Sequence, residues 1–331
     1  MRTNIGFIGA GGVAGRHMHN LLRFDEVRIA AAADPVHERA KAFARETREA
    51  KAYDDWRGML GGERLDALYI CTPPFAHGAP ELEAIERGLP FFVEKPLSAD
   101  VATAEQIGAA LARNPVPTAV GYHWRYLDTV EQMRDVLSER PARLVNGYWL
   151  DSTPPPRWWR RQNESGGQFV EQTTHIFDLA RHLVGVVAEV TAVAGRTPRR
   201  EAWPDCDVAE ASVAVLRFAS GAVGTMASTC LLKWPHRIGL NLYGDDVAIE
   251  LTERDMGVYG APGTIERVAE GDPFMREDRD FIDAVRGRPD RIRVPYGEAL
   301  KTHRLAHAAT RSIAEGRTMR LRTEHTEARY E

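Results

Sequence analysis

Residues 5–15 read Ile-Gly-Phe-Ile-Gly-Ala-Gly-Gly-Val-Ala-Gly, and this stretch decides the fold of the chain. The apolar run Ile5–Ile8 predicts a β-strand, and Gly9, Gly11 and Ala14 then occupy the three small-residue positions of the pattern G-x-G-x-x-G/A. The first small residue permits a tight turn, the second lets the backbone approach a pyrophosphate, and the third lets the next helix pack on the strand. That helix would present its free N–H groups to the pyrophosphate. The stretch therefore predicts a dinucleotide site that includes Gly9, Gly11, Gly12 and Val13.

Asp34 follows a second apolar run, Val27–Ala33, some twenty residues after the glycine pattern. A carboxylate at this distance is typical of the group that accepts hydrogen bonds from the adenosine ribose hydroxyls. It would repel a 2′-phosphate, and the nearest basic residue, Arg39, lies one helical turn further on. Asp34-Pro35 could also be no more than a turn that ends a strand. The residues favour NAD over NADP as the cofactor.

Composition limits the class of protein. A length of 331 residues predicts about two domains, and 44% hydrophobic with 27% charged residues is typical of a globular protein. The net charge of −4 does not support nucleic-acid binding, and three scattered cysteines do not predict a disulfide framework or a zinc site. Met1 leads directly into the first strand, and no apolar run is long enough to cross a bilayer. We therefore expect no signal peptide, no membrane partner and a cytoplasmic location.

The chain changes its pattern after its first third. Short apolar strands alternate there with helices, which indicates a parallel sheet covered on both faces. From Arg143 the predicted strands are longer and joined by hairpin turns, so the second sheet is expected to be antiparallel, with the helix predicted over residues 167–184 or a second subunit covering one face. The expected fold is α/β. It comprises a doubly wound Rossmann domain at residues 1–122, an α+β domain with a large, mostly antiparallel sheet at 123–319, and a frayed tail at 320–331.

Two segments end predicted strands at the same sheet edge, where ligands bind in open α/β sheets. The first segment is Thr72-Pro73-Pro74, which is followed by His77. Its threonine would contact a ribose or the nicotinamide of the cofactor. The alternative is that the two prolines only make a strand-to-helix connection rigid. In Glu94-Lys95-Pro96, a lysine beside a cofactor suits proton transfer. A solvated lysine in an ordinary loop is the alternative.

A third segment is the helix predicted after Gly166-Gly167. On one continuous helix Glu171, His175, Asp178 and His182 are spaced by three or four residues and share a face. A carboxylate one turn before a histidine suits general-base catalysis, in which Glu171 orients His175 and His175 takes a hydroxyl proton. The pair could bind a metal instead, but no third ligand is evident, so we expect none. A solvated helix face is the remaining alternative.

The segment Pro154–Arg160 holds two adjacent tryptophans between arginines. Tryptophan faces stack on sugar rings and arginine pairs with carboxylates, so this segment could form a lid over a sugar-like or acidic ligand. A proline-rich loop with its tryptophans anchored in an interface has equal weight.

Together and in this order, the segments resemble the Gfo/Idh/MocA oxidoreductase family (glucose-fructose oxidoreductase, inositol dehydrogenase and relatives). The resemblance covers nearly the whole chain and extends to Gly121–Tyr126 and Glu298-Ala299-Leu300. It implies that Lys95 contacts the nicotinamide and the substrate hydroxyl, and that His175 is the general base or orients the substrate. Glu171 stands where the family usually has aspartate. It keeps the charge on a longer side chain, and it contacts substrate, bridges to Lys95 or orients His175.

The resemblance implies an NAD-dependent dehydrogenase that acts on a secondary alcohol of a sugar, inositol or related polyol and forms a homodimer or homotetramer. Two alternatives are a cofactor-binding sensor without turnover and an enzyme that uses bound NAD transiently for elimination or hydrolysis. The candidate residues are Lys95, His175 and Glu171 for catalysis; Gly9, Gly11, Gly12, Val13, Asp34, Thr72, Pro73, His77, Glu94 and Lys95 for the cofactor; and His123, Arg125, Trp158, Trp159 and Gln172 for the substrate.

Overall fold

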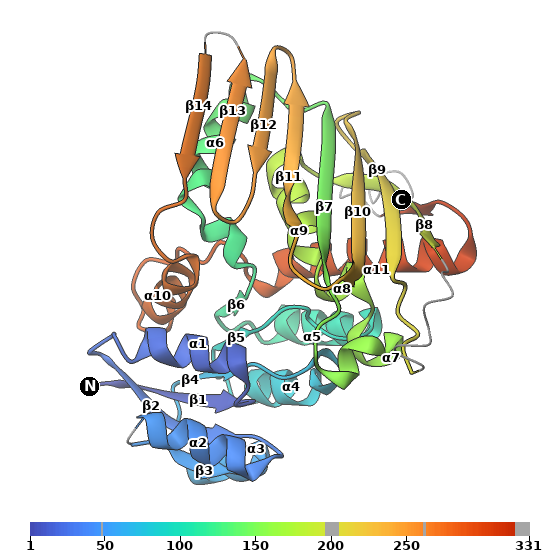
Figure 1. Ribbon diagram of the computed structural model, residues 1–331. Coiled ribbons are helices and arrows are strands. Elements are labelled where there is room, and N and C mark those ends of the chain that lie inside the picture. Colours follow the sequence, from blue (N-terminus) through green and yellow to red (C-terminus); the bar gives the residue numbers. More distant parts are fainter. Residues whose placement is uncertain (48, 196–204, 261–262, 322–331) are drawn as a thin grey trace. The chain divides into compact units, whose positions relative to one another are not determined.

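The computed structural model describes residues 1–331 except 48, 196–204, 261–262 and 322–331. The chain forms two compact units, each built on one β-sheet (Figure 1). The first unit takes residues 1–98, 102–126 and 272–300, and the second takes 99–101, 127–271 and the residues from 301 onward. Residues 272–300 therefore belong with the amino-terminal sheet, which differs from the boundary expected at residue 122. Among the described residues, no helix combines the length and apolar character needed to cross a bilayer.

The first unit contains a six-stranded parallel sheet in the order β3-β2-β1-β4-β5-β6. Strand order runs outward from β1 in one direction and from β4 in the other, so the switch point lies between these two strands. Because helices cover both faces, the strands are almost continuously apolar, and the predicted doubly wound fold is confirmed. The strands are β1 Thr3–Ile8, β2 Val27–Ala33, β3 Lys51–Tyr53, β4 Ala67–Ile70, β5 Phe91–Val93 and β6 Thr118–Val120.

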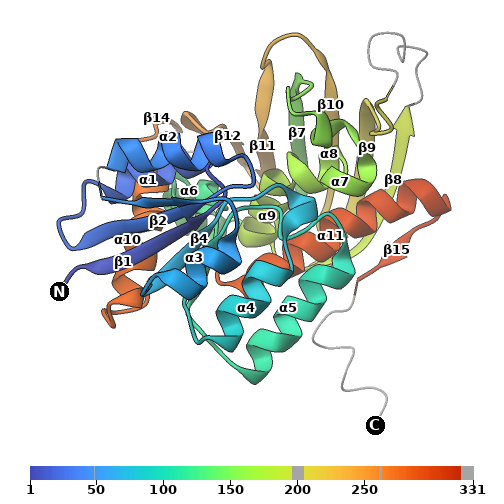
Figure 2. The same cartoon turned by 90° about the horizontal axis from the view of Figure 1, so that it is seen from below.

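Two apolar clusters bury the two faces of this sheet, and Figure 2 shows helices of the first unit on both of its sides. One face packs against α1 (Gly12–Leu21), α2 (His37–Thr47) and α10 (Pro273–Val285). The other packs against three consecutive helices and the first residues of a fourth, namely α3 (Trp56–Gly62), α4 (Ala79–Glu86), α5 (Val101–Arg113) and α11 (Tyr296–Glu315).

Helix α10 was not predicted, although it completes the core of the first unit. Phe281 meets the rings of Tyr69 and Phe92 edge-on, at 5.5 Å and 5.9 Å between centroids. The apolar face of a helix is visible in its sequence, but that face does not tell which sheet it covers. For this reason the prediction placed residues 273–285 in the second domain, although they pack in the first unit.

The second unit contains a nine-stranded sheet in the order β14-β13-β12-β11-β7-β10-β9-β8-β15. Neighbouring strands are antiparallel except the central pair β7 and β10, which is parallel, so the expected mostly antiparallel sheet is confirmed. Of the tail predicted at 320–331, Arg320 belongs to β15 and residues 322–331 lie outside the described part. The strands are β7 Leu144–Ser152, β8 Val187–Gly195, β9 Ala211–Phe218, β10 Val223–Leu232, β11 Arg237–Gly244, β12 Val247–Leu251, β13 Asp255–Gly260, β14 Gly263–Val268 and β15 Met319–Arg320.

The strands of this second sheet alternate between buried and exposed side chains. In β9, Ser212, Ala214 and Leu216 are buried, whereas Val213 and Val215 are exposed. Helices α8 and α9 pack on the buried face of the sheet. The α-helices of this unit are α6 (Asp128–Glu139), α7 (Gln162–Ser165), α8 (Gln168–Glu171), α9 (Thr174–Val184) and most of α11. The opposite face presents exposed apolar side chains, and we call this set the open face: Leu144, Val193, Val213, Val215 and Val223.

Candidate active site

The glycine loop after β1 has the conformation and the space that a pyrophosphate needs. Gly9 has a φ of +91°, and a Cβ there would clash with the carbonyl oxygen of Cys71, so glycine is required. A Cβ on Gly11 or Gly12 would meet nothing within 4 Å. Helix α1 begins at Gly12, and its N-cap residue, Gly11, provides no side-chain hydrogen bond. An anion can therefore approach the first N–H groups of α1.

Asp34 lies beside this loop at the end of β2 and is buried. Its Oδ2 accepts a hydrogen bond from the N–H of Ala10 at 3.0 Å, and its Oδ1 accepts one from the N–H of Val36 at 2.8 Å. The carboxylate thus joins the glycine loop to the second strand. Each carboxylate oxygen can accept a second hydrogen bond, so Asp34 fits the ribose hydroxyls of a dinucleotide.

The loop after β4 presents two buried polar atoms that lack a partner among the described residues. One is the hydroxyl oxygen of Thr72, and the other is Nε2 of His77. His77 is oriented through its other ring nitrogen, which lies 2.5 Å from Oε1 of Glu81. Buried polar atoms are normally hydrogen-bonded, so both atoms fit a ligand bound at this sheet edge.

Glu94 and Lys95 follow β5 at the same edge. Glu94 is buried, and its Oε2 accepts the N–H of Lys95 at 3.1 Å, while Lys95 is half-buried. Burial alone raises the pKa of Glu94, but the hydrogen bond and charge of His17, with the charges of Lys95 and His123, outweigh it, and the pKa lies below its ordinary value. Glu94 is therefore an anion at neutral pH.

The predicted substrate residues of the first unit lie in a short 3-10 turn, His123–Tyr126, and are buried. The ring of His123 stacks on Phe274 with 4.0 Å between centroids. Arg125 forms an ion pair with Glu298 at 3.3 Å, and its carbonyl oxygen accepts a hydrogen bond from Arg293. These contacts join the turn to residues 272–300, and the pairing of Arg125 with Glu298 is a structural role that the sequence did not predict.

The single helix predicted over residues 167–184 is wrong, because α8 ends at Glu171 and α9 begins at Thr174. The two β-branched residues Thr173 and Thr174 disfavour continuation of a helix, and the hydroxyl of Thr173 bonds instead to that of Ser228 on β10, at 2.7 Å. Glu171 therefore belongs to α8, whereas His175 and Asp178 belong to α9, and the continuous helix on which their shared face was based is interrupted. Asp178 accepts a hydrogen bond from Thr302 at 2.7 Å and is a core residue of the second unit.

The side chain of Glu171 contacts the segment Pro154–Arg160, which was predicted as a possible lid. The indole N–H of Trp159 donates to its Oε2 at 2.6 Å. Trp159 is buried in the 3-10 turn Arg157–Arg160, and Trp158 is half-buried beside the same small cluster. Gln172, also predicted, is buried and accepts a hydrogen bond from Gln168 at 3.1 Å.

His175 lies in the first turn of α9 and is buried. Its ring stacks on that of Trp149 of β7, at 5.8 Å between centroids and 17° between planes. The indole N–H of Trp149 is buried and has no hydrogen-bond partner among the described residues. No motif of the sequence marks Trp149 as a candidate, because its contact with the start of α9 depends on the tertiary fold.

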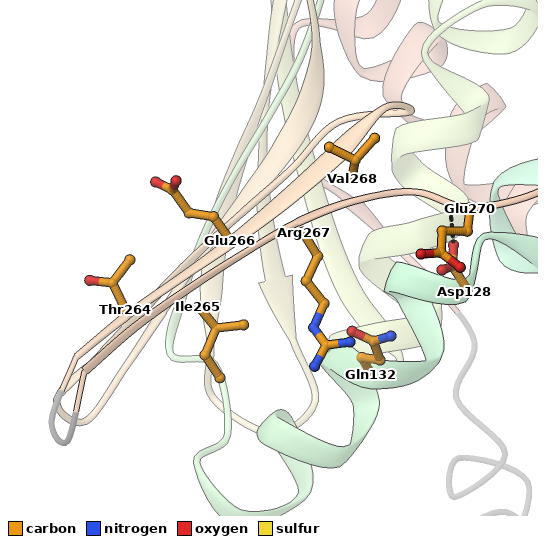
Figure 3. Close-up of a pocket in the computed structure, with 8 residues that line it drawn as sticks. All are labelled: Asp128, Gln132, Thr264, Ile265, Glu266, Arg267, Val268 and Glu270. Atoms are coloured by element: carbon orange, nitrogen blue, oxygen red, sulfur yellow. Dashed lines mark hydrogen bonds between the residues drawn. The ribbon is translucent and has the colours of Figure 1, made fainter.

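A separate hollow of about 800 Å³ lies between α6 and the edge strand β14 in the second unit (Figure 3). Its lining is mainly polar, and Figure 3 shows Arg267 and Gln132 near each other beside the pair Asp128 and Glu270. None of the residues predicted for catalysis or binding lines it. We assign no chemistry to this hollow.

The fold and the site together define an oxidoreductase that uses a dinucleotide. A sequence profile described as oxidoreductase family, NAD-binding Rossmann fold, matches residues 3–122, and one described as the GFO/IDH/MocA C-terminal domain matches residues 141–250. These matches span well over half of the chain. The protein belongs to the Gfo/Idh/MocA family, and the resemblance predicted from its motifs is confirmed, as is the prediction of an NAD-dependent oxidoreductase.

Relatives and solved structures agree with this assignment. A myo-inositol 2-dehydrogenase of Thermotoga maritima is 25% identical over 96% of this chain and 98% of its own length. A scyllo-inositol 2-dehydrogenase (NAD(+)) of Bacillus subtilis is 28% identical over 73% and 71%. The crystal structure of the WlbA dehydrogenase from Bordetella pertussis, in complex with NADH and UDP-GlcNAcA, superposes with a TM-score of 0.84 at 22% identity over 98% of this chain and 100% of that one. The last likeness shows the fold.

Proposed function

We propose that this protein oxidises a secondary alcohol of a sugar, an inositol or a related polyol. The observation that carries the proposal is the polar group at the start of α9, where His175 stacks on Trp149 and the buried indole N–H has no partner among the described residues. A hydroxyl both donates and accepts hydrogen bonds, so it suits an imidazole beside an indole N–H. The names of the two inositol dehydrogenases support a cyclic polyol as the first substrate to test.

Oxidation of the alcohol removes a hydride from carbon and a proton from oxygen. NAD, held by the glycine loop and Asp34, supplies the hydride acceptor when it is bound. We infer that His175 accepts the hydroxyl proton, since an imidazole is suited to general-base catalysis near neutral pH. For Lys95 of the first unit we propose a separate electrostatic role, in which its ammonium group would stabilise negative charge on a substrate oxygen.

Glu171 and the tryptophan turn would act around this centre. The hydrogen bond from Trp159 to Glu171 supports a positioning role for this carboxylate, which fixes the turn that carries the tryptophans. Trp158 is half-buried and is our candidate for stacking on a sugar ring. We propose both roles for the substrate side of the site.

The test incubates the protein with NAD or NADP and a panel of inositols, aldoses, sugar acids and nucleotide sugars. The absorbance of the reduced cofactor measures the reaction. We expect turnover with NAD, and a loss of about 10²- to 10⁴-fold in kcat for Lys95→Ala and for His175→Ala. Lys41→Ala and His19→Ala are matched controls, because both residues are exposed and only form surface ion pairs with Glu38 and Glu46. Full activity after removal of both Lys95 and His175 side chains would contradict the assigned roles, and NAD binding without turnover on any substrate would contradict the activity.

We also propose that the protein assembles as a homodimer or homotetramer through the open face of the second sheet. Val193 and Val213 are cross-strand neighbours there, and both are exposed, at 67% and 41%. A second copy of the same chain would bury this apolar surface on each subunit.

We also propose the cytoplasmic location that is expected from the sequence, because NAD must be shared with the enzymes that regenerate it. Cell fractionation tests this location.

A further inference from the structure

His17 of α1 is a fully buried histidine that contacts two carboxylates of the first unit. Its Nδ1 lies 2.7 Å from Oδ1 of Asp278, and its Nε2 lies 3.1 Å from Oε1 of Glu94. Asp278 also accepts hydrogen bonds from Asn20 at 2.8 Å and from the hydroxyl of Tyr69 at 3.0 Å. The network therefore connects α1, the end of β5 and helix α10.

The charge of His17 follows from its neighbours. An imidazole can donate from both ring nitrogens only when it is protonated. Burial alone lowers the pKa of His17, but the charge and hydrogen bond of Asp278, followed by those of Glu94, raise it well above its ordinary value. His17 is therefore an imidazolium at neutral pH, and it donates a hydrogen bond to Asp278 and another to Glu94.

Glu277 lies in the same cluster, where one ligand atom from it, His17 and Glu94 lie within 4.8 Å of one another. Both of its carboxyl oxygens are buried and have no hydrogen-bond partner among the described residues. Burial, with the charges of Glu94 and Asp278, raises its pKa well above the ordinary value, although His17 and Arg16 oppose the shift. These shifts favour the neutral form of Glu277, and the two carboxylates in contact with the ring of His17 are Glu94 and Asp278.

We propose that His17 is a positioning residue for Lys95. His17 holds Oε1 of Glu94, and Oε2 of Glu94 accepts the N–H of Lys95. The carboxylate is thus fixed at both oxygens, and the backbone that carries Lys95 is fixed with it. This inference rests on the proposed function of Lys95.

Three further observations support this positioning role. A Cβ on Gly121 would clash with its carboxylate, so the group is packed against the backbone after β6 and has little room to shift. The helix that carries His17 also begins at the glycine loop, so one rigid element both offers its N-terminus to the cofactor and holds the turn of the catalytic lysine. Helix α10 contributes Asp278, which orients His17 from the other side.

Two neutral substitutions separate the two hydrogen bonds of His17. In His17→Gln the amide nitrogen stands at the same position along the side chain as Nε2, so the bond to Glu94 is kept and that to Asp278 is lost. In His17→Asn the amide nitrogen replaces Nδ1, so the bond to Asp278 is kept and that to Glu94 is lost. Both variants lose the same charge and are compared at equal extents of folding, checked by circular dichroism.

The first readout is steady-state kinetics. We expect His17→Asn to lower kcat by about 10²-fold, because a misplaced catalytic group loses that order of rate, with the KM for NAD changed less than about threefold. His17→Gln should retain at least about ten times the kcat of His17→Asn. Equal kcat values for the two variants would overturn the proposal, since a merely structural histidine would not distinguish them.

The second readout does not depend on turnover. Hydrogen exchange of the peptide that contains the Lys95 amide, measured by mass spectrometry, should be faster in His17→Asn than in His17→Gln or the wild type. Unchanged exchange in both variants overturns the role of His17, even when the wild type is active. An inactive wild type with the expected exchange pattern leaves the role of His17 standing and refutes the proposed function alone. Metal analysis of the wild type completes the test, because one equivalent of a divalent metal, lost in both variants, would make His17 a metal ligand with Glu94 and Glu277 and would overturn the proposal.

Discussion

The two sheets of this chain bury their strands in different ways. The six parallel strands are covered on both faces by helices of their own unit, so only the loops after the strands can bind a ligand. The nine-stranded sheet has helices on one face and exposed apolar side chains on the other. A doubly covered sheet therefore leaves its edge for a ligand, whereas the singly covered sheet also leaves an apolar face, which we propose as the subunit contact.

Glycine substitutions in the first unit test the edge site and have the largest expected effect. Gly9→Ala combines a positive φ with a clash against the Cys71 carbonyl, so we expect a loss of stability of at least about 2 kcal/mol in urea unfolding. Gly11→Ala places its methyl group in open space. It should keep the stability of the wild type within about 0.5 kcal/mol and weaken NAD binding at least about tenfold, measured by calorimetry. Unaltered NAD affinity in a folded Gly11→Ala variant would show that the cofactor does not bind at this loop.

A charge on the open face tests the second half of the comparison. Val215→Glu would place a carboxylate in the proposed subunit contact, so we expect a dimer or tetramer to dissociate to monomers at micromolar concentration. Light scattering after size exclusion measures the mass. Val36→Glu is the control, because Val36 is similarly exposed but lies in the first unit. A wild type that is already monomeric, or a variant that assembles normally, removes the open face as the contact.

The smallest expected effect concerns the two buried histidines of the two units. Burial, with the charge of His303, holds the pKa of His307 well below its ordinary value, whereas the carboxylates raise that of His17. Below pH 6.5 the unfolded chain protonates residue 307 before the folded chain does, so stability falls as the pH falls, by at most about 1.4 kcal/mol per pH unit. His17 has the opposite sign, and its contribution is complete below pH 6.5 and lost as the pH rises through its folded pKa.

Urea unfolding at pH 5.0 and 7.0 measures the contribution of His307. We expect His307→Phe to narrow the stability difference between these two pH values relative to the wild type. His37→Phe is a suitable control, because His37 is exposed at the start of α2. The same pH difference in the wild type and His307→Phe would show that His307 is not buried as a neutral group.

The fold of the first unit and its use of NAD could be predicted from local sequence, whereas the contacts between distant segments could not, for a physical reason. Buried parallel strands are continuous apolar runs, and the candidate cofactor residues follow them directly, as Asp34 and Glu94 do. By contrast, Asp278 reaches His17 from a helix more than two hundred residues away in the chain, and no periodicity connects them. The break between α8 and α9 is accompanied by a hydrogen bond from Thr173 to Ser228 of β10, and Trp149 meets His175 only through the tertiary fold.

We propose that this chain transfers a hydride from a polyol carbon to NAD. The most direct measurement uses C-deuterated myo-inositol first, then the other active substrates, and locates the label by mass spectrometry of the recovered cofactor. Transfer of one deuterium to the nicotinamide ring, lost in Lys95→Ala and His175→Ala, is the predicted result. Product formed with no deuterium in the cofactor, or no product and no label with any polyol although NAD binds, would contradict it.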